Sequence, residues 1–133
     1  MEWREQAEAA EELQDWDTAI TLVSAHAMCY GDSEEHDSHL WHMGLLFRAQ
    51  RLTELMELAL TDIHARRVLN RSLGRCGMES ALRDRAGAGA ADALYVLVRR
   101  QCETGRTQEA RRTAHEIEPA GGYAHRMVAS YQD

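Results

Sequence analysis

The sequence predicts an all-α protein, and three of its features support this fold class. Residues 2–14 consist almost wholly of good helix formers. In several later segments, apolar residues recur three and four positions apart, which is the period of a helix with one buried face. Short turns rich in Gly, Asp and Ser separate these segments, and strand signals are nearly absent.

The helix signals divide the chain into about nine segments joined by short turns. The expected helical segments are residues 2–14, 19–28, a third that holds residues 40–47, 52–60, a fifth from residue 62 to 74 or 77, 78–86, 92–103, 107–117 and 123–131. Cap-type residues, Asp15 and Thr18, separate the first two segments. Asp37 or Ser38 is expected to cap the third helix, and Thr107 is expected to cap the eighth.

Length and hydropathy indicate the organisation and location of the protein. A chain of 133 residues predicts a single domain, residues 1–133. No apolar stretch approaches the roughly 20 residues that span a bilayer, so no membrane partner is expected. The N-terminal residues Met1–Gln6 are acidic and lack the apolar core of a signal peptide. These observations predict a cytoplasmic protein.

The residue types present exclude several kinds of chemistry. All 15 basic residues are Arg, so a Schiff-base lysine and a phosphate-loop lysine are both excluded. Arg usage together with abundant Ala and Gly indicates a GC-rich, bacterial genome. Gly87–Asp92 has the glycine spacing of a dinucleotide loop, but it ends in Asp and follows a helix rather than a strand. With no nucleophile–base or carboxylate pair at diagnostic spacing, neither an enzyme nor a cofactor is predicted.

Charge is unevenly distributed along the chain. Residues 1–37 contain 11 acidic residues and one Arg, a formal charge of −10, whereas residues 38–133 contain 11 acidic residues and 14 Arg, a charge of +3. This asymmetry can support head-to-tail association in a homodimer or attract a basic partner to the first helices. A solvated acidic helix face is the simpler alternative. The overall charge of −7 argues against general nucleic-acid binding.

The segment 91–119 has the spacing of a helical repeat. Leu94 and Leu97 are three residues apart, Gly105 lies in the following turn, and Ala110 comes five residues later. This pattern resembles the tetratricopeptide repeat family, in which a Leu follows the apolar residue that opens the first helix. In that family Gly occupies the inter-helix turn and a small residue begins the second helix. Pro119 resembles the terminal proline of the repeat, although it comes early.

Earlier segments resemble the same family more loosely. Ala19 takes the small position in the first unit, and Leu55 and Ala81 occupy it in the middle units. Successive intervals between these positions, up to Ala110, are 36, 26 and 29 residues, not a steady ~34. The resemblance therefore covers most of the chain with degenerate repeats. It implies a right-handed α–α superhelix of about four helix pairs, a C-terminal capping helix and a concave groove.

The resemblance also implies a function, that of a non-catalytic adaptor that binds a protein or peptide in the groove. Inner-face positions of the family hold basic and amide residues that grip a peptide. Arg66 and Asn70 match these positions four residues apart, and Tyr95 and Arg99 repeat the spacing. These four residues are the peptide-binding candidates. Alternatively, the arginines pair with local acids, namely Asp62, Asp92 and Glu103.

Three histidines support a different function, a small-molecule- or metal-responsive regulatory domain. His36, His39 and His42 lie three residues apart near the start of a predicted helix. Imidazole and carboxylate groups bind zinc or nickel, and helical geometry allows two of the three histidines to act together. Solvated histidines are the simpler interpretation, so no metal site is predicted.

The remaining conspicuous side chains are expected to be structural. The tryptophans are expected in the core rather than in a ligand pocket; they are Trp3, Trp16 and Trp41. The cysteines are expected to be reduced and packed as small apolar side chains; they are Cys29, Cys76 and Cys102.

Overall fold

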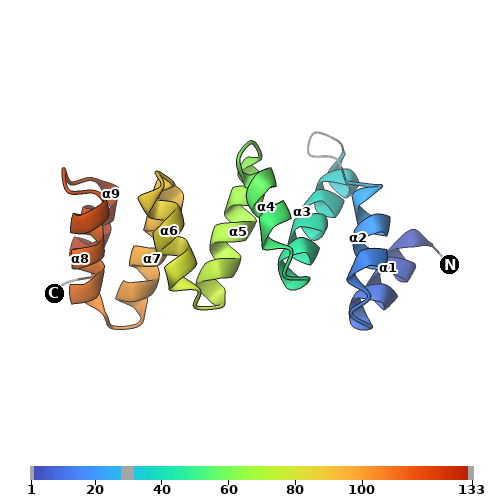
Figure 1. Ribbon diagram of the computed structural model, residues 1–133, viewed down its shortest axis with the longest axis horizontal. Coiled ribbons are helices and arrows are strands. Elements are labelled where there is room, and N and C mark those ends of the chain that lie inside the picture. The colour runs from blue at the N-terminus through green and yellow to red at the C-terminus, as the bar shows by residue number, and fades with distance from the viewer. Residues whose placement is uncertain (1, 28–31, 132–133) are drawn as a thin grey trace. The chain divides into compact units, whose positions relative to one another are not determined.

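The computed structural model describes residues 2–27 and 32–131, and all regular secondary structure in these ranges is α-helical (Figure 1). The described helices are α1 (Trp3–Glu12), α2 (Trp16–Ser24), α3 (Ser33–Arg48), α4 (Leu52–Ala59), α5 (Ile63–Arg75), α6 (Glu79–Gly87), α7 (Ala91–Glu103), α8 (Thr107–Ile117) and α9 (Tyr123–Ser130). The predicted all-α fold class is confirmed. The superhelical stacking implied by the repeat resemblance stays a prediction.

The helices form two compact units, Met1–Leu69 and Asn70–Asp133, which we call the N-terminal and C-terminal units. Helix α5 crosses the boundary between them. In the N-terminal unit α1 packs against α2, α2 against α3, and α3 against α4. In the C-terminal unit α7 packs against α6, α8 and α9. Helix α7 is therefore the central helix of the C-terminal unit.

Each unit buries small and large apolar side chains together. Ala19 and Leu55 are fully buried in the N-terminal unit, and Ala110 is fully buried in the C-terminal unit. These are three of the repeat positions inferred from the sequence, whereas Ala81 is only partly buried. Small residues at such positions let helix backbones approach one another closely. Local spacing was thus a good guide to burial at three of the four positions.

Two of the expected caps are wrong. Helix α3 begins at Ser33, so Asp37 and Ser38 lie inside it. Its cap is a capping box, in which Asp32 accepts a hydrogen bond from the Glu35 N–H at 2.9 Å and the Glu35 carboxylate accepts one from the Asp32 N–H at 3.4 Å. Thr107 is the first residue of α8 rather than its cap.

Other helix boundaries follow the local signals. Asp15, one of the cap-type residues of the expected break, caps α2, because its carboxylate accepts a hydrogen bond from the Thr18 N–H at 3.4 Å. Helix α2 therefore begins at Trp16, earlier than the expected start at residue 19. Gly105 turns the chain between α7 and α8 with a φ of +80°, a left-handed conformation that favours glycine. Gly74 has a different role, because a Cβ at this position would lie 2.9 Å from Val96 Cγ1. Its missing side chain allows α5 and α7 to approach closely.

The tryptophans and cysteines are less uniformly buried than expected. All three tryptophans are only partly buried, and Trp41 Nε1 donates a hydrogen bond to Glu11 Oε1 at 2.9 Å. Cys102 is buried as expected, but Cys76 is exposed. Cys29 lies outside the described residues. Among the helices that the structure describes, none has the length and apolar character needed to cross a membrane.

Candidate peptide-binding surface

Two of the sequence-predicted binding residues, Tyr95 and Arg99, lie one turn apart on α7 and near α9. The Tyr95 ring meets the Tyr123 ring edge-on, with the centroids 4.9 Å apart. Arg99 is exposed and lines a shallow cavity of about 350 Å³ together with residues of α9 and its C-cap. The α9 side of this cavity consists of Tyr123, Arg126, Met127, Ser130 and Tyr131. We call these residues, with Tyr95 and Arg99, the α7–α9 surface.

The α7–α9 surface combines cations with exposed aromatic rings. Tyr123 and Tyr131 are 46% and 41% exposed, and the Arg126 guanidinium carbon lies 5.9 Å from the centre of the Tyr123 ring. Partial desolvation raises the pKa of Tyr131, and Glu103 adds to the increase. The Tyr131 hydroxyl therefore stays protonated near neutral pH. Arg and Tyr side chains of this kind are enriched where proteins bind other proteins.

Arg99 and Arg126 form no ion pair with any residue that the structure describes. The expected alternative, in which Arg99 pairs with Asp92 or Glu103, is therefore not seen in the described ranges. A guanidinium without an acidic partner can form a forked contact with a carboxylate from another molecule. The α7–α9 surface consequently has two uncommitted cations beside an aromatic cavity.

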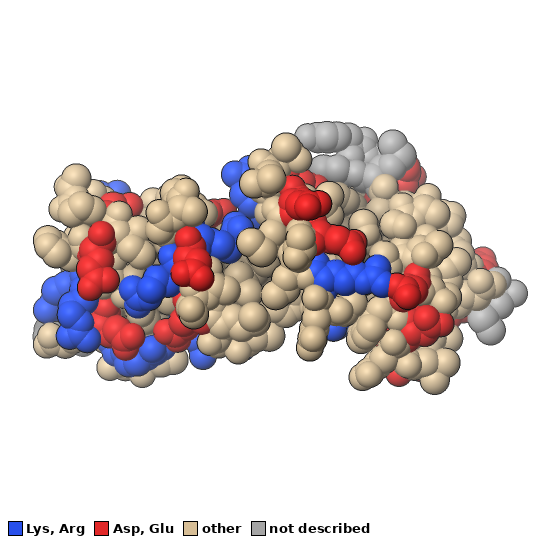
Figure 2. Space-filling model, viewed as in Figure 1, with Lys and Arg blue, Asp and Glu red and all other residues tan. Residues whose placement is uncertain are grey.

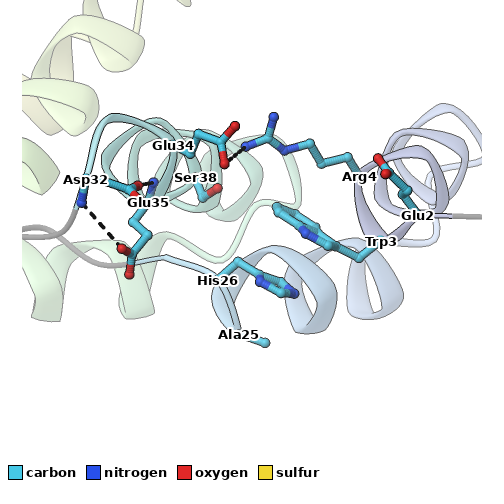
Figure 3. Close-up of a pocket in the computed structure, with 9 residues that line it drawn as sticks. All are labelled: Glu2, Trp3, Arg4, Ala25, His26, Asp32, Glu34, Glu35 and Ser38. Carbon is cyan, nitrogen blue, oxygen red and sulfur yellow. Dashed lines mark hydrogen bonds and ion pairs between the residues drawn. The ribbon is translucent and has the colours of Figure 1, made fainter.

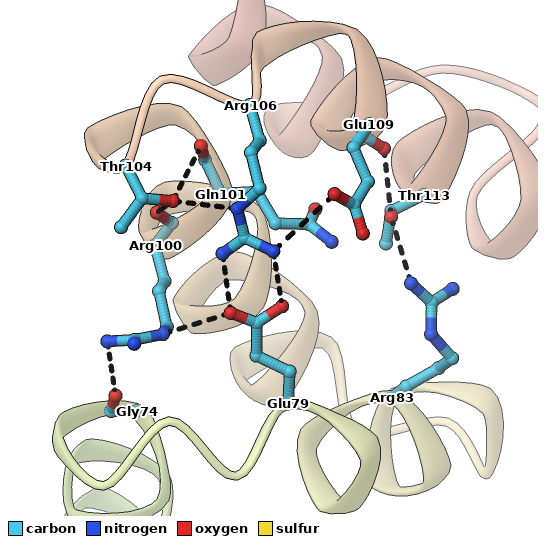
Figure 4. Close-up of polar contacts among 9 residues, drawn as sticks. All are labelled: Gly74, Glu79, Arg83, Arg100, Gln101, Thr104, Arg106, Glu109 and Thr113. Carbon is cyan, nitrogen blue, oxygen red and sulfur yellow. Dashed lines mark hydrogen bonds and ion pairs between the residues drawn. The ribbon is translucent and has the colours of Figure 1, made fainter.

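Other arginines of the C-terminal unit are committed to structural contacts (Figure 4). Arg100 Nε donates to Glu79 at 3.0 Å, and the Arg106 Nη atoms donate to the same carboxylate at 3.0 and 2.5 Å. Arg100 also donates through Nη1 to the Gly74 carbonyl at 2.8 Å. These contacts connect α5, α6 and α7 and the cap of α8. They stabilise the scaffold and leave Arg100 and Arg106 unavailable to a ligand.

Figure 2 shows acidic and basic side chains lying beside one another over the C-terminal helices. Ion pairs such as Arg83 with Glu116, 3.6 Å apart, account for part of this arrangement. Such exposed pairs each contribute little, about 0–1 kcal/mol, to stability. Charge alone therefore does not define a binding surface here, and the unpaired state of particular arginines is the more informative property.

The other two predicted binding residues are placed differently. Asn70 is only 3% exposed, and its Oδ1 accepts a hydrogen bond from Arg85 Nε at 3.0 Å. Arg66 belongs to the N-terminal unit and is partly buried, and its Nε has no hydrogen-bond partner among the described residues. Asn70 thus orients Arg85 within its own unit. The structure brings Tyr95 and Arg99 to one surface, but it does not add Asn70 to that surface.

The histidines of α3 meet a histidine that the sequence interpretation had not considered. The centroid of the His64 ring, from α5, lies 4.8 Å from the centroid of the His36 ring and 6.0 Å from that of the His39 ring. His39 Nε2 is 2.7 Å from Asp62 Oδ2. Partial desolvation raises the pKa of Asp62, but hydrogen bonds from His64 N, Ala65 N and His39 outweigh it and lower the pKa. No group of three potential ligands in the described ranges is placed to hold a metal ion.

His42 lies on the same helix, but the described ring contacts of His36 and His39 are with His64 and not with His42. Burial lowers the pKa of His42, the nearby His39 lowers it further, and Glu54 opposes both effects. A histidine with a lowered pKa is neutral at pH 7.

No family model, curated protein sequence or solved structure matches this chain.

Gln101 is a buried polar residue that lies among the contacts drawn in Figure 4, and replacing it tests what its amide contributes to stability. Its side chain is fully buried on α7, and neither Oε1 nor Nε2 has a partner among the described residues. An unsatisfied buried amide is costly. Gln101→Met, which keeps the volume and removes the polar atoms, is therefore expected to raise the free energy of unfolding by about 1 kcal/mol. Urea denaturation measures this change; a loss of stability would show that the amide has a partner in solution.

Proposed function

We propose that this chain is a non-catalytic adaptor that binds an acidic segment of a partner protein through the α7–α9 surface. The observation that supports this proposal best is the pair Arg99 and Arg126, which are exposed, have no ion pair among the described residues and line one cavity with Tyr123. The sequence resemblance to tetratricopeptide repeats points to the same class of function. Arg99 belongs to the binding residues that the resemblance implies, and Tyr95, another of them, contacts the Tyr123 ring of this surface.

The chemistry of the surface selects a carboxylate-bearing peptide. Two guanidinium groups provide forked donors, and the tyrosine rings with Met127 provide apolar contact. The Tyr131 hydroxyl is already engaged, because it donates a hydrogen bond to Glu103 Oε1 at 3.4 Å. An acidic segment with Asp or Glu side chains beside Leu or Phe would use both kinds of contact. A cavity of about 350 Å³ has room for one or two such side chains rather than for a large cofactor.

The proposal is tested by titrating the protein with a fluorescein-labelled peptide of alternating Asp and Leu residues, measured by fluorescence anisotropy. Arg99→Ala/Arg126→Ala is expected to weaken binding by about tenfold or more, because two charge-assisted contacts are removed. A peptide of alternating Ser and Leu is expected to bind weakly to both proteins.

The matched control is Arg111→Ala/Arg112→Ala. Both arginines are exposed on α8 and, like Arg99 and Arg126, form no ion pair with a described residue. This variant loses the same charge, so it is expected to bind the Asp-Leu peptide as the wild type does. An equal loss in the two double variants would indicate general attraction to Arg, and unchanged affinity in Arg99→Ala/Arg126→Ala would reject the surface.

A native partner can be sought with the same two double variants. Tagged wild-type protein is used for affinity capture from its own cell lysate, followed by mass spectrometry. The partner of this surface is expected to be retained by the wild type and by Arg111→Ala/Arg112→Ala, and lost by Arg99→Ala/Arg126→Ala. Direct titration of the purified partner then measures the affinity.

A further inference from the structure

A cavity in the N-terminal unit lies between the start of α1, the end of α2 and the start of α3 (Figure 3). Its volume of about 660 Å³ is in the usual range of small-molecule sites. The cavity is lined by Glu2, Trp3, Arg4, Ala25, His26, Asp32, Glu34, Glu35 and Ser38. It is separate from the α7–α9 surface, and nothing in the proposed function uses it.

Acidic side chains dominate the polar lining of this cavity. Four carboxylates face a single guanidinium, so the lining has a net formal charge of −3 with His26 neutral. Asp32 and Glu35 are engaged in the capping box of α3. The Glu34 carboxylate contacts only Arg4, at 3.8 Å, and the Glu2 carboxylate has no hydrogen-bond or ion-pair partner among the described residues. These two lining carboxylates are therefore the ones that can bind an added cation.

The aromatic lining favours a cation as well. The Trp3 and His26 rings are stacked 4.0 Å apart with an interplanar angle of 7°. The Arg4 guanidinium carbon lies 5.3 Å from the centre of the Trp3 ring, and Figure 3 shows this guanidinium reaching Glu34. A cation over an indole ring is stabilised by the negative face of that ring. The chain's own Arg4 thus already occupies a position that suits a cation.

Ser38 gives an independent indication of a ligand. It is only 3% exposed, it lines the cavity, and its hydroxyl has no hydrogen-bond partner among the residues that the structure describes. Figure 3 shows the hydroxyl on the cavity side of α3, between Glu34 and Trp3. The hydroxyl keeps some access to the cavity, because it is not among the fully enclosed polar atoms of the described residues. A donor group inside the cavity would provide a hydrogen-bond partner.

We propose that this cavity binds a primary ammonium group on an aliphatic chain. An ammonium has three N–H donors, and the lining offers it acceptors in the Glu2 and Glu34 carboxylates and the Ser38 hydroxyl. The aliphatic chain would lie against Trp3 and Ala25. Such a group occurs in free diamines and in lysine side chains of other proteins. The chain itself contains no lysine, so the ligand must come from another molecule.

The proposal is tested by isothermal titration calorimetry with two probes, 1,5-diaminopentane and Nα-acetyl-lysine methylamide. Saturable binding of one or both at a single site is expected. Glu2→Gln/Glu34→Gln is expected to weaken it by about tenfold. Arg4→Gln is expected to tighten it, because a competing cation is removed from Glu34. Binding of the diamine alone would identify a free amine as the source, and binding of the lysine derivative would identify a protein side chain.

Two controls separate this site from general attraction between an acidic protein and a cation. Glu5→Gln/Glu8→Gln removes the same charge from exposed positions of α1 outside the cavity lining, and it should leave the affinity unchanged. The Nε-acetylated lysine derivative, which lacks the positive charge, should not bind. The indole N–H resonance of Trp3, assigned with Trp3→Phe, should shift on binding. Absence of binding by both amines, or equal weakening in the two double variants, would overturn the proposal.

Discussion

Leu97→Ala is expected to lower the free energy of unfolding by about 3 kcal/mol, the middle of the range for a buried leucine. Leu97 is fully buried on α7, the helix that packs against α6, α8 and α9. The substitution removes three carbon atoms and leaves a cavity that the surrounding helices fill only partly. Urea denaturation followed by circular dichroism measures the change, and the slope with denaturant should stay close to that of the wild type.

Arg99→Ala is the control for this measurement, because it lies on the same helix and is exposed. Its effect on the free energy of unfolding is expected to be within about 0.5 kcal/mol. Leu97→Ala and Arg99→Ala therefore separate the buried side of α7 from its proposed binding side. A loss below about 1 kcal/mol for Leu97→Ala would contradict the central position of α7 in the C-terminal unit.

Local sequence signals predicted the helices well, because the signals themselves are local. Gly105 and Ala110 specify a turn and a close helix crossing within a few residues of each other. The error at the start of α3 had a local cause too. Asp37 and Ser38 are also cap-type residues and were chosen instead of Asp32, which forms the capping box with Glu35. A search for the Asp-x-x-Glu spacing would have found the correct start.

The binding surface was harder to predict, because exposure depends on packing between segments distant in sequence. Arg99 and Arg100 are neighbours, yet Arg100 is bound to Glu79, 21 residues away, and Arg99 has no described ion-pair partner. Asn70 is likewise engaged, because its side chain accepts a hydrogen bond from Arg85 on the next helix. A four-residue spacing shows that two residues share a helix face, but it does not show whether that face is covered.

Residues of α9 were missed because that helix was interpreted only as a cap. Tyr123 and Arg126 contribute the second half of the α7–α9 surface, and both were visible in the sequence as an aromatic–Arg pair three residues apart. His64 was missed for a related reason, since only the fold brings α5 beside His36. Pairing between helices, rather than helix formation, limited the prediction from sequence.

Glu79→Gln is expected to lower the free energy of unfolding at pH 7 by about 2 kcal/mol, a value reduced to allow for partial solvent exposure. The Glu79 side chain is 24% exposed, and its two oxygens accept hydrogen bonds from Arg100 and Arg106. Glutamine has one acceptor oxygen, and its NH₂ group would face guanidinium donors. The substitution therefore removes the attraction between the carboxylate and the two guanidinium groups, and it places N–H donors of the amide against N–H donors of the arginines. Urea denaturation measures the loss.

The effect should depend on pH, because the pKa of Glu79 is lowered from the ordinary value of 4.5. Hydrogen bonds from Arg106 are the largest cause of this decrease, and those from Arg100 add to it against partial desolvation. A carboxyl group with a lowered pKa in the folded state contributes its full stabilisation above its unfolded pKa, and that contribution is lost as the pH falls through the folded value. The difference in stability between wild type and Glu79→Gln should therefore be constant from neutral pH to about pH 5 and shrink in more acidic solution.

Acid sensitivity of other groups, including Asp62, is common to both proteins and cancels in this difference. Glu116→Gln is the matched control, because Glu116 is 65% exposed and 3.6 Å from Arg83, and its effect should stay below about 0.5 kcal/mol. If the difference for Glu79→Gln persisted unchanged at about pH 3, packing of the side chain rather than its charge would hold α6 to α7. If it shrinks as expected, the charge of the Glu79 carboxylate is what holds Arg100 and Arg106 in the scaffold, whereas Arg99, the neighbour of Arg100 on α7, has no described ion-pair partner.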